Sequence, residues 1–226
     1  MFNINFLLKI NNLSKKLFDF ILPNRCLLCK NFSELIICQD CLNSIDFTQR
    51  QINFDSPYLD AIFSLTEYKD QIRAILEQIK FNGYNNLGFV LNSKIMKNID
   101  LSSVKIDLAV AIPIHKARYK KRGYNQVEIL FYEVLKKYHY LPLISRSKNT
   151  PPLFSLDKKE RQKILDQAFS INSKFDIQHK NILVLDDICT SGTTLNEAAK
   201  LLKQYGANKI YGLTLSFVPE KSKIVL

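Results

Sequence analysis

The chain has 226 residues, of which 46% are hydrophobic, and it carries a formal net charge of +11. This length fits one full domain with a small appendage, and the hydrophobic content is ordinary for a soluble globular protein. No stretch approaches the length of a bilayer-spanning segment, so we expect no transmembrane helix and a cytoplasmic protein.

The excess positive charge lies in the middle of the chain. Residues 1–60 carry 6 basic and 6 acidic side chains, whereas residues 105–163 carry 14 basic and 5 acidic ones. A basic segment of this kind favours a polyanionic partner, either a phosphorylated small molecule or nucleic acid. A solvated, lysine-rich surface is the alternative, and composition alone leaves it open.

The first 22 residues have the pattern of an amphipathic helix. Pro23 ends a run in which apolar side chains recur at helical spacing, at Phe6, Ile10, Leu13, Leu17 and Ile21. Asn and Lys interrupt the apolar stretch and no small-residue cleavage site follows, which argues against a signal peptide. We expect this helix, residues 1–22, to dock on the protein or on a partner. Peripheral contact with a membrane surface is the alternative.

Four cysteines form two pairs after this helix. They are spaced C-x₂-C-x₈-C-x₂-C, at Cys26, Cys29, Cys38 and Cys41. Thiolates at this spacing can surround one tetrahedral Zn²⁺, so we predict a structural zinc module over residues 23–50. Two disulfides are the alternative, but they are typical of secreted proteins and leave a fifth thiol over. That thiol, Cys189, stands apart, and we interpret it as a small packing side chain.

Strand and helix signals alternate beyond this module. The segment from Gln51 to Leu59 is polar and turn-rich, which suggests a boundary before a second domain over residues 60–226. Periodicity predicts helices over 70–80 and 87–99 and a buried strand over 106–112. This alternation favours an α/β fold with a parallel sheet.

The most informative stretch is NILVLDDICTSGTT, residues 181–194. Ile182 to Leu185 is typical of a buried strand, with Asp186 and Asp187 expected at its carboxyl end, where open parallel sheets bind ligands. The next residues introduce a helix that ends at Gly206 and has apolar positions at Leu195, Ala198, Ala199, Leu202 and Tyr205. A helix N-terminus behind small hydroxylated residues is an anion site, here predicted to comprise Thr190, Ser191, Gly192, Thr193 and Thr194.

Two carboxylates beside a phosphate site repel the phosphate unless they contact another part of the ligand. The vicinal diol of a sugar is such a part, so a ribose 5-phosphate suits both halves of the stretch. The nucleotide-binding patterns G-x-x-x-x-G-K-[ST] and G-x-G-x-x-G are absent from the chain. An ordinary strand, turn and capped helix explains the hydrophobic pattern but not two acids followed by TSGTT.

A second candidate site follows the strand over 106–112. Five of the seven residues from Lys116 to Arg122 are basic, a density that favours bound anions. Tyrosines interleave these cations, as in grooves that bind single-stranded DNA. The predicted nucleic-acid-binding residues are Lys116, Arg118, Tyr119, Lys120, Lys121, Arg122 and Tyr124. Tyrosines that only pack are the alternative.

The stretch ILVLDDICTSGTT resembles the phosphoribosyl pyrophosphate (PRPP) motif of the type I phosphoribosyltransferases. Together with the paired cysteines, KFNGYNNL from Lys80 to Leu87 and the run HKARYKKRGYNQ, it resembles the ComF family of competence-associated, phosphoribosyltransferase-like proteins. The resemblance implies a type I phosphoribosyltransferase-like fold, a Rossmann-like parallel sheet with flanking helices, beside the cysteine module. The family also implies T-x-x-Q-x-x-L-x-x-x-x-R-x-x-N; Thr150, Leu156 and Arg161 match, whereas Leu153 and Ile164 replace the expected Gln and Asn.

The resemblance also implies roles for individual residues. Type I transferases displace pyrophosphate from ribose without a covalent protein nucleophile, so positioning and electrostatics dominate. The implied ligands are PRPP and the Mg²⁺ that accompanies it. Asp186 and Asp187 would hold the diol and orient the ion, and Lys116 would offset charge on pyrophosphate, which makes these three the catalytic candidates. Ile114, His115 and Lys116 would form the pyrophosphate loop, although His115 is equally typical of a hydrogen-bonded structural residue.

Two functions follow from the resemblance. The first is a PRPP-binding protein of natural transformation that helps to handle imported single-stranded DNA, with DNA-uptake or recombination proteins as partners. The alternative is an active salvage transferase that moves ribose 5-phosphate from PRPP to a nucleobase or amine. Nothing in the sequence identifies an acceptor pocket.

Overall fold

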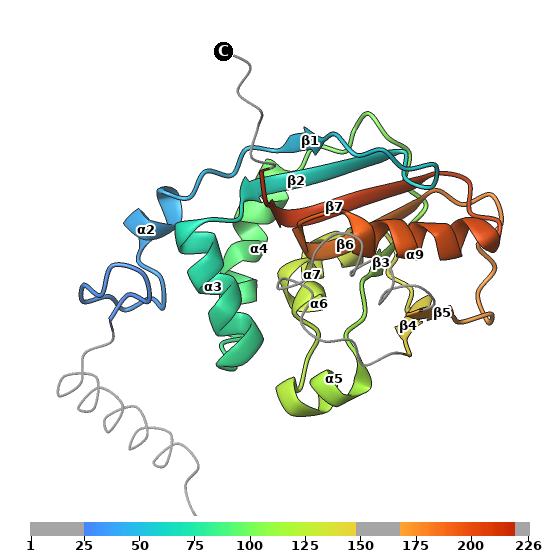
Figure 1. Ribbon diagram of the computed structural model, residues 1–226. Helices are drawn as coiled ribbons and strands as arrows, with labels where there is room; N and C mark the ends of the chain where they lie inside the picture. Colours follow the sequence, from blue (N-terminus) through green and yellow to red (C-terminus); the bar gives the residue numbers. More distant parts are fainter. Residues whose placement is uncertain (1–24, 148–167, 220–226) are drawn as a thin grey trace, which may run out of the picture. The chain divides into compact units, whose positions relative to one another are not determined.

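The structure, a computed structural model, describes residues 25–147 and 168–219. The chain divides into two compact units, residues 1–45 and 46–226, which are treated separately (Figure 1). The helix predicted over residues 1–22 and the family segment from Thr150 to Ile164 lie outside the described residues. The cysteine module, predicted to end at Arg50, ends earlier, because Arg50 begins a strand of the second unit.

The described part of the first unit is a pair of turns followed by one short helix. Its first turn is closed by two backbone hydrogen bonds, from Cys26 N–H to the Asn31 carbonyl at 2.8 Å and from Lys30 N–H to the Cys26 carbonyl at 3.0 Å. Lys30 adopts a positive φ of 65° to complete this turn. Helix α2 (Gln39–Asn43) follows the third cysteine directly and carries the fourth.

A five-stranded sheet forms the centre of the second unit. Its order is β1-β2-β7-β6-β3, and the last four of these strands are parallel to one another. The strands are β1 (Arg50–Ile52), β2 (Ala61–Glu67), β3 (Leu108–Ala111), β6 (Ile182–Cys189) and β7 (Ile210–Phe217). The parallel α/β fold expected from the sequence is therefore confirmed. Strand β1, in the stretch expected to be a boundary, adds an antiparallel edge to β2.

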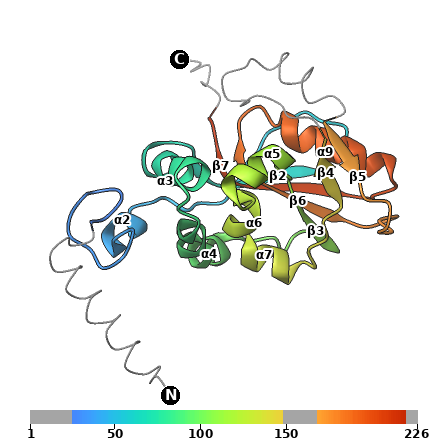
Figure 2. The ribbon, with the colours of Figure 1, turned by 90° about the horizontal axis from the view of Figure 1, so that it is seen from below.

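Helices and a small ribbon cover the two faces of this sheet. Figure 2 shows α9 and the β4–β5 ribbon on one face and α6 and α7 on the other. The elements on the faces are α6 (Gln126–Leu130), α7 (Tyr132–Lys137), β4 (Ile144–Arg146), β5 (Phe169–Ile171) and α9 (Thr193–Gln204). Two further helices, α3 (Asp70–Phe81) and α4 (Asn86–Asn98), pack together, and α4 contacts α6 and α7. One further helix, α5 (Lys116–Arg122), follows β3.

The predicted helices agree closely with those observed. In α3 the four apolar positions at helical spacing are all buried: Ile72, Ile75, Leu76 and Ile79. In α9 the predicted face is buried at Leu195, Ala198, Ala199 and Leu202. The prediction was wrong for Tyr205, which is 48% exposed, because α9 ends at Gln204 and Tyr205 already leaves the helix. Within the described ranges, no helix is both long and apolar enough to cross a membrane.

Candidate ligand-binding site

The two acids of the central motif lie inside a strand. The sequence predicted that the strand ends at Leu185, but β6 continues to Cys189. The strand is thus longer than predicted, because the neighbouring strand β7 continues beside it. Asp186 lies opposite Thr214 of β7, and Ile188 lies opposite Ser216, so the backbone ladder continues where the apolar run stops.

The side chains of Asp186 and Asp187 leave β6 in opposite phases, although both reach one cavity at the carboxyl end of the sheet. Successive side chains of a strand alternate between faces. Asp186 has the same phase as Ile182 and Val184, which pack in the core with α9. Asp187 instead accepts a hydrogen bond from Gln126 Nε2 of α6, at 2.9 Å. The acid pair therefore contacts two different groups of elements at the carboxyl end of the sheet.

Asp187 is held by a chain of polar side chains. Its Oδ2 atom lies 2.9 Å from Nζ of Lys80, at the end of α3, in addition to its bond from Gln126. The Oε1 atom of Gln126 in turn accepts a hydrogen bond from Arg122 of α5. This chain joins three helices to one carboxylate and fixes its orientation.

Asp186 is only 8% exposed and is destabilised in its charged form. Burial and the neighbouring charge of Asp187 raise its pKa to about 7, although the Asp187 N–H, Lys80 and Arg146 act in the opposite direction. The Asp187 N–H donates to Asp186 Oδ1 at 2.8 Å. A carboxyl group with this pKa changes its charge near neutral pH.

The residues after β6 form the predicted turn into a helix. Gly192 has a φ of +67° and occupies the N-cap position of α9, and its carbonyl accepts from Asn196 N–H at 2.9 Å. Hydroxyls of Ser191 and Thr193 hydrogen-bond to each other at 2.8 Å. A side chain on Gly192 would meet the ring of Phe54 at 2.3 Å, so both the space and the backbone conformation require glycine. The turn thus presents the helix N-terminus that the sequence predicted.

The basic run after β3 is the helix α5. His115 precedes it, and its Nδ1 atom accepts a hydrogen bond from the Ala117 N–H at 3.2 Å, so this side chain caps the helix. Gly123 ends α5 with a φ of 84°. The loop before the helix is held by Asn125, whose amide donates to the Ile112 carbonyl at 3.0 Å.

A cavity of about 320 Å³ lies where these segments meet. Its wall includes the cations Lys80, Arg118, Lys121, Arg122 and Arg146, together with both acids. Thr190 and Thr194 contribute hydroxyls from the predicted phosphate turn, and the remaining lining is Phe81, Ile112, Pro113, Ile114, Ile188 and Gln126. Of the predicted pyrophosphate loop, Ile114 lines the cavity. His115 serves as the helix cap, and Lys116 is exposed to solvent.

Several lining residues were not among the sequence candidates. Lys80 and Gln126 lie in the two segments that resemble the family, KFNGYNNL and HKARYKKRGYNQ. The resemblance therefore pointed to these segments, but it did not predict that these two residues contact Asp187. Arg146 had no such signal. Arg146 is 8% exposed, its guanidinium carbon lies 5.7 Å from the centre of the Phe169 ring, and burial lowers its pKa. A buried cation on β4 thereby joins the site from a distant part of the chain.

A larger hollow of about 430 Å³ lies at the β1–β2 connection. It is lined by Gln51 to Asp55 and by Leu59 to Ile62, which include the acids Asp55 and Asp60 but no Lys or Arg. This charge balance is unsuited to an anionic ligand. We therefore take the smaller, cationic cavity as the candidate site.

The tyrosines of the basic run differ in their surroundings. Tyr119 is 50% exposed on α5. Tyr124 is partly buried, its hydroxyl donates to the Ile79 carbonyl at 2.5 Å, and burial raises its pKa. Tyr124 therefore ties the segment after α5 to α3, whereas Tyr119 faces solvent.

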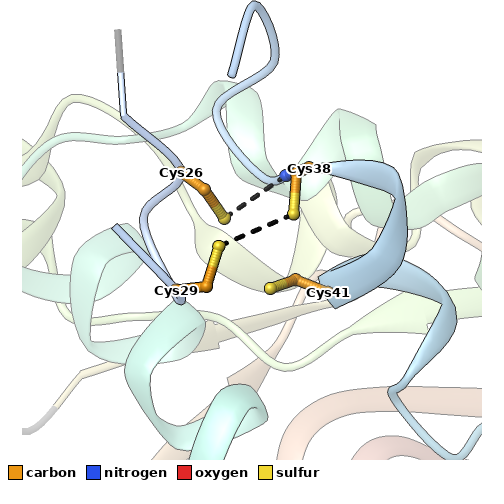
Figure 3. Close-up of side chains that lie close together, drawn as sticks. All are labelled: Cys26, Cys29, Cys38 and Cys41. Atoms are coloured by element: carbon orange, nitrogen blue, oxygen red, sulfur yellow. Dashed lines mark hydrogen bonds between the residues drawn. The ribbon is translucent and has the colours of Figure 1, made fainter. Parts of the chain in front are cut away.

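The four paired cysteines converge in the first unit (Figure 3). Their sulfur atoms all lie within 4.8 Å of one another, and Cys29 Sγ is 3.8 Å from Cys38 Sγ. A tetrahedron with metal–sulfur bonds of about 2.3 Å has edges of about 3.8 Å, so the group fits one metal ion. All four are free thiols, and no other group of three metal-ligating residues occurs in the described ranges.

The four thiols strongly affect one another's ionisation. Burial opposes ionisation of Cys26, but N–H groups of Cys38, Cys29 and Leu28 outweigh it and lower its pKa to about 6. Hydrogen bonding with the Cys38 thiol, burial and the other two cysteines raise the pKa of Cys41 to about 12. Thiolates so close repel one another, and a divalent cation among them would allow all four to ionise.

Comparison with known proteins identifies the family. Residues 60–223 match the phosphoribosyl transferase domain family. Competence protein F of Haemophilus influenzae is 27% identical over 164 residues, 68% of this chain and 71% of that protein. Competence protein ComFC of Streptococcus pneumoniae is 31% identical over 156 residues, 69% and 66% of the two chains. The chain belongs to the ComF family.

Other ComF-family relatives carry a different name. DNA utilization protein YhgH of Escherichia coli is 22% identical over 159 residues, which are 67% of this chain and 69% of that protein. The matched domain contains β2, β7, β6 and β3 and every residue that lines the cationic cavity. The type I phosphoribosyltransferase fold expected from the resemblance is confirmed.

Proposed function

We propose that this protein binds PRPP with Mg²⁺ in the cationic cavity and helps to handle imported single-stranded DNA during natural transformation. The observation that supports PRPP binding is the set of residues that line the cationic cavity. A phosphate turn, two acids and five cations surround a single space of about 320 Å³. Five positive side chains against two acids give a net +3, which complements a ligand rich in phosphate charge.

Each part of the cavity suits a different part of PRPP. The turn from Thr190 to Thr194 would bind the 5-phosphate through backbone N–H groups and hydroxyls. Asp186 and Asp187 would accept hydrogen bonds from the ribose diol. Arg118, Lys121, Arg122 and Arg146 would offset the charge of the diphosphate. Mg²⁺ would arrive with the ligand, because this ion usually combines one or two carboxylates with substrate phosphates.

The DNA half of the proposal is supported by the relatives and by α5. The relatives described above are named for competence or DNA utilization. Helix α5 offers exposed lysines and an exposed tyrosine beside the cavity, and cations with stacking rings are the usual means of binding single-stranded DNA. DNA-uptake or recombination proteins are the partners this role would require.

We further propose that the four-cysteine cluster holds a structural Zn²⁺ and that the protein works in the cytoplasm. The sulfur separations suit zinc, and metal-bound thiolates are typical of reducing compartments, where disulfides are rare. Bound metal would stabilise a unit whose described part contains only one short helix.

Calorimetric titration with PRPP tests the first half. We expect one binding site whose affinity requires Mg²⁺ and falls at least tenfold in the Asp186→Ala and Asp187→Ala variants. Unchanged affinity in both variants would contradict the site. Pyrophosphate release with a panel of nucleobases and amines tests the alternative of an active transferase, because acceptor-dependent turnover that is lost in the same variants would establish it.

A further inference from the structure

Helix α5 carries its charges on two opposite faces. Residues of an α-helix are separated by about 100° around its axis, so positions 118, 121 and 122 share one face. All three of these side chains, Arg118, Lys121 and Arg122, line the cavity. Lys116, Tyr119 and Lys120 lie on the opposite face, and all three are exposed.

The inner face of α5 is tied to Asp187 through Gln126. Arg122 donates to Gln126, which donates to Asp187, and burial lowers the pKa of the Arg122 guanidinium. None of the α5 residues is buried, and the hydrogen bond from Arg122 together with the two caps helps to hold the helix in place. The His115 side chain closes one end, and Gly123 N–H bonds the Tyr119 carbonyl at 2.7 Å at the other. Helix α5 is therefore a short, capped unit attached at the cavity.

The outer face suits a nucleic acid strand. Lys116 and Lys120 are one turn apart and can contact successive phosphates, and Tyr119, 50% exposed, offers a ring between them. A stacked base adds roughly 1–3 kcal/mol to single-strand binding regardless of its identity. Because the strand would use this face, it would not need the cations that line the cavity.

We infer that α5 binds both ligands at once, PRPP on its inner face and single-stranded DNA on its outer face, so that each ligand weakens the other by a limited factor. This inference rests on the proposed function. A bound diphosphate cancels positive charge that would otherwise attract DNA. The two faces are about 10–12 Å apart across the helix, close to the Debye length of about 8 Å at physiological salt. Salt therefore partly screens the repulsion between bound PRPP and DNA, so saturating PRPP weakens DNA binding by a limited factor and does not abolish it.

The experiment measures the affinity of the full chain for a fluorescein-labelled 20-nucleotide oligothymidylate by anisotropy. PRPP is increased at constant Mg²⁺ and at 0.15 M salt. We expect the Kd for DNA to rise about three- to tenfold and then to reach a plateau once PRPP saturates its site. The plateau should be higher at 0.03 M salt, where screening is weaker.

Two variants separate the faces. The outer-face double variant Tyr119→Ala/Lys120→Ala should weaken DNA binding at least tenfold while the calorimetric Kd for PRPP changes less than twofold. The matched control is Tyr132→Ala/Lys136→Ala on α7, which removes a tyrosine of equal exposure, 50%, and an exposed lysine four residues later. The control should change the Kd for DNA less than twofold.

Three results would overturn the inference. A Kd for DNA that rises in proportion to PRPP without a plateau means that both ligands use the same groups. A Kd that does not move at saturating PRPP means that the faces are independent. DNA binding unchanged in the outer-face variant means that the strand binds elsewhere. Absence of any calorimetric signal for PRPP would instead remove the proposed function, and the inference with it.

Discussion

The ammonium of Lys80 lies 2.9 Å from Oδ2 of Asp187, the same oxygen that receives the Gln126 amide. Within the described residues, the ion pair and the side-chain hydrogen bond of this carboxylate both fall on Oδ2, so Oδ1 is the atom through which Asp187 can accept hydrogen bonds from a ligand. The side chains of Lys80 and Asp187 are 20% and 9% exposed. The pair therefore holds a carboxylate in the cavity with one oxygen already engaged.

Removing Lys80 should damage both stability and ligand binding. In Lys80→Met the buried carboxylate loses its cation, which we expect to lower the free energy of unfolding by roughly 1–3 kcal/mol, below the figure for a fully buried pair. PRPP affinity should fall at least tenfold, because Asp187 loses its orientation. Chemical denaturation and calorimetry measure the two effects.

An exposed ion pair on the same helix gives the control for Lys80. Arg73 Nε lies 3.0 Å from Glu77 Oε1, with side chains 65% and 46% exposed. Arg73→Met should leave the free energy of unfolding nearly unchanged, because solvent screens an exposed pair. Equal losses in the two variants would show that the Lys80 pair has no special role.

Asp186 makes stability depend on pH. Its pKa rises from 3.8 to about 7 on folding, so between these values the folded chain binds more protons than the unfolded chain. The free energy of unfolding should therefore fall as the pH rises from about 4 to about 7, by on the order of 4 kcal/mol, and then level off. Urea denaturation across this range measures the slope. In Asp186→Asn this part of the slope should vanish, and persistence of the full slope would contradict the assignment.

The turn of the proposed phosphate site should reject any side chain at Gly192. Gly192→Ala places a Cβ both at a positive φ and against the Phe54 ring. We expect a loss of roughly 1–2 kcal/mol from the backbone and another 1–3 from the contact, together with loss of PRPP binding.

Gly83 separates the backbone effect from the steric one. It also has a positive φ, +76°, but a Cβ there would meet nothing within 4 Å. Gly83→Ala should therefore lose only the backbone contribution of about 1–2 kcal/mol and should retain the phosphate turn. If both variants lose the same stability, the Phe54 contact is not restrictive.

The cysteine cluster should bind one zinc ion per chain. Elemental analysis of the purified protein should give this ratio, and Cys26→Ser should reduce it well below one and unfold the first unit. Cys189→Ser is the matched control, because this thiol lies outside the cluster, is buried, and has a pKa raised to about 11 by burial. Full zinc content in Cys26→Ser would contradict the site.

The sequence indicated those elements whose hydrophobic pattern is regular. Four isoleucines and leucines at helical spacing defined α3, and four consecutive apolar residues located β6. Strands β2 and β7 were not predicted, because hydroxylated side chains interrupt their apolar pattern. Ser64, Thr66, Thr214 and Ser216 are nevertheless buried, at 0–1% exposure. These hydroxylated side chains are buried because neighbouring strands and helices cover them in the folded sheet. The sequence pattern of a single strand carries no information about those neighbours.

The candidate site shows the same division. Its local motif was visible, because the acids and the phosphate turn are consecutive in the chain. Contacts between distant segments were not: Lys80 and Gln126 meet Asp187 only once the sheet has formed, and Arg146 joins through β4. The sequence likewise did not separate the two faces of α5, which the structure distinguishes because Arg118, Lys121 and Arg122 line the cavity.

A crystal structure of the full chain with PRPP and Mg²⁺ tests the central claim most directly. The account predicts the 5-phosphate against the N–H groups of the turn from Thr190 to Thr194, with the ribose diol within hydrogen-bond distance of Asp186 and Asp187. Density for PRPP elsewhere on the protein, or in the cavity with its ribose turned away from both acids, would contradict it.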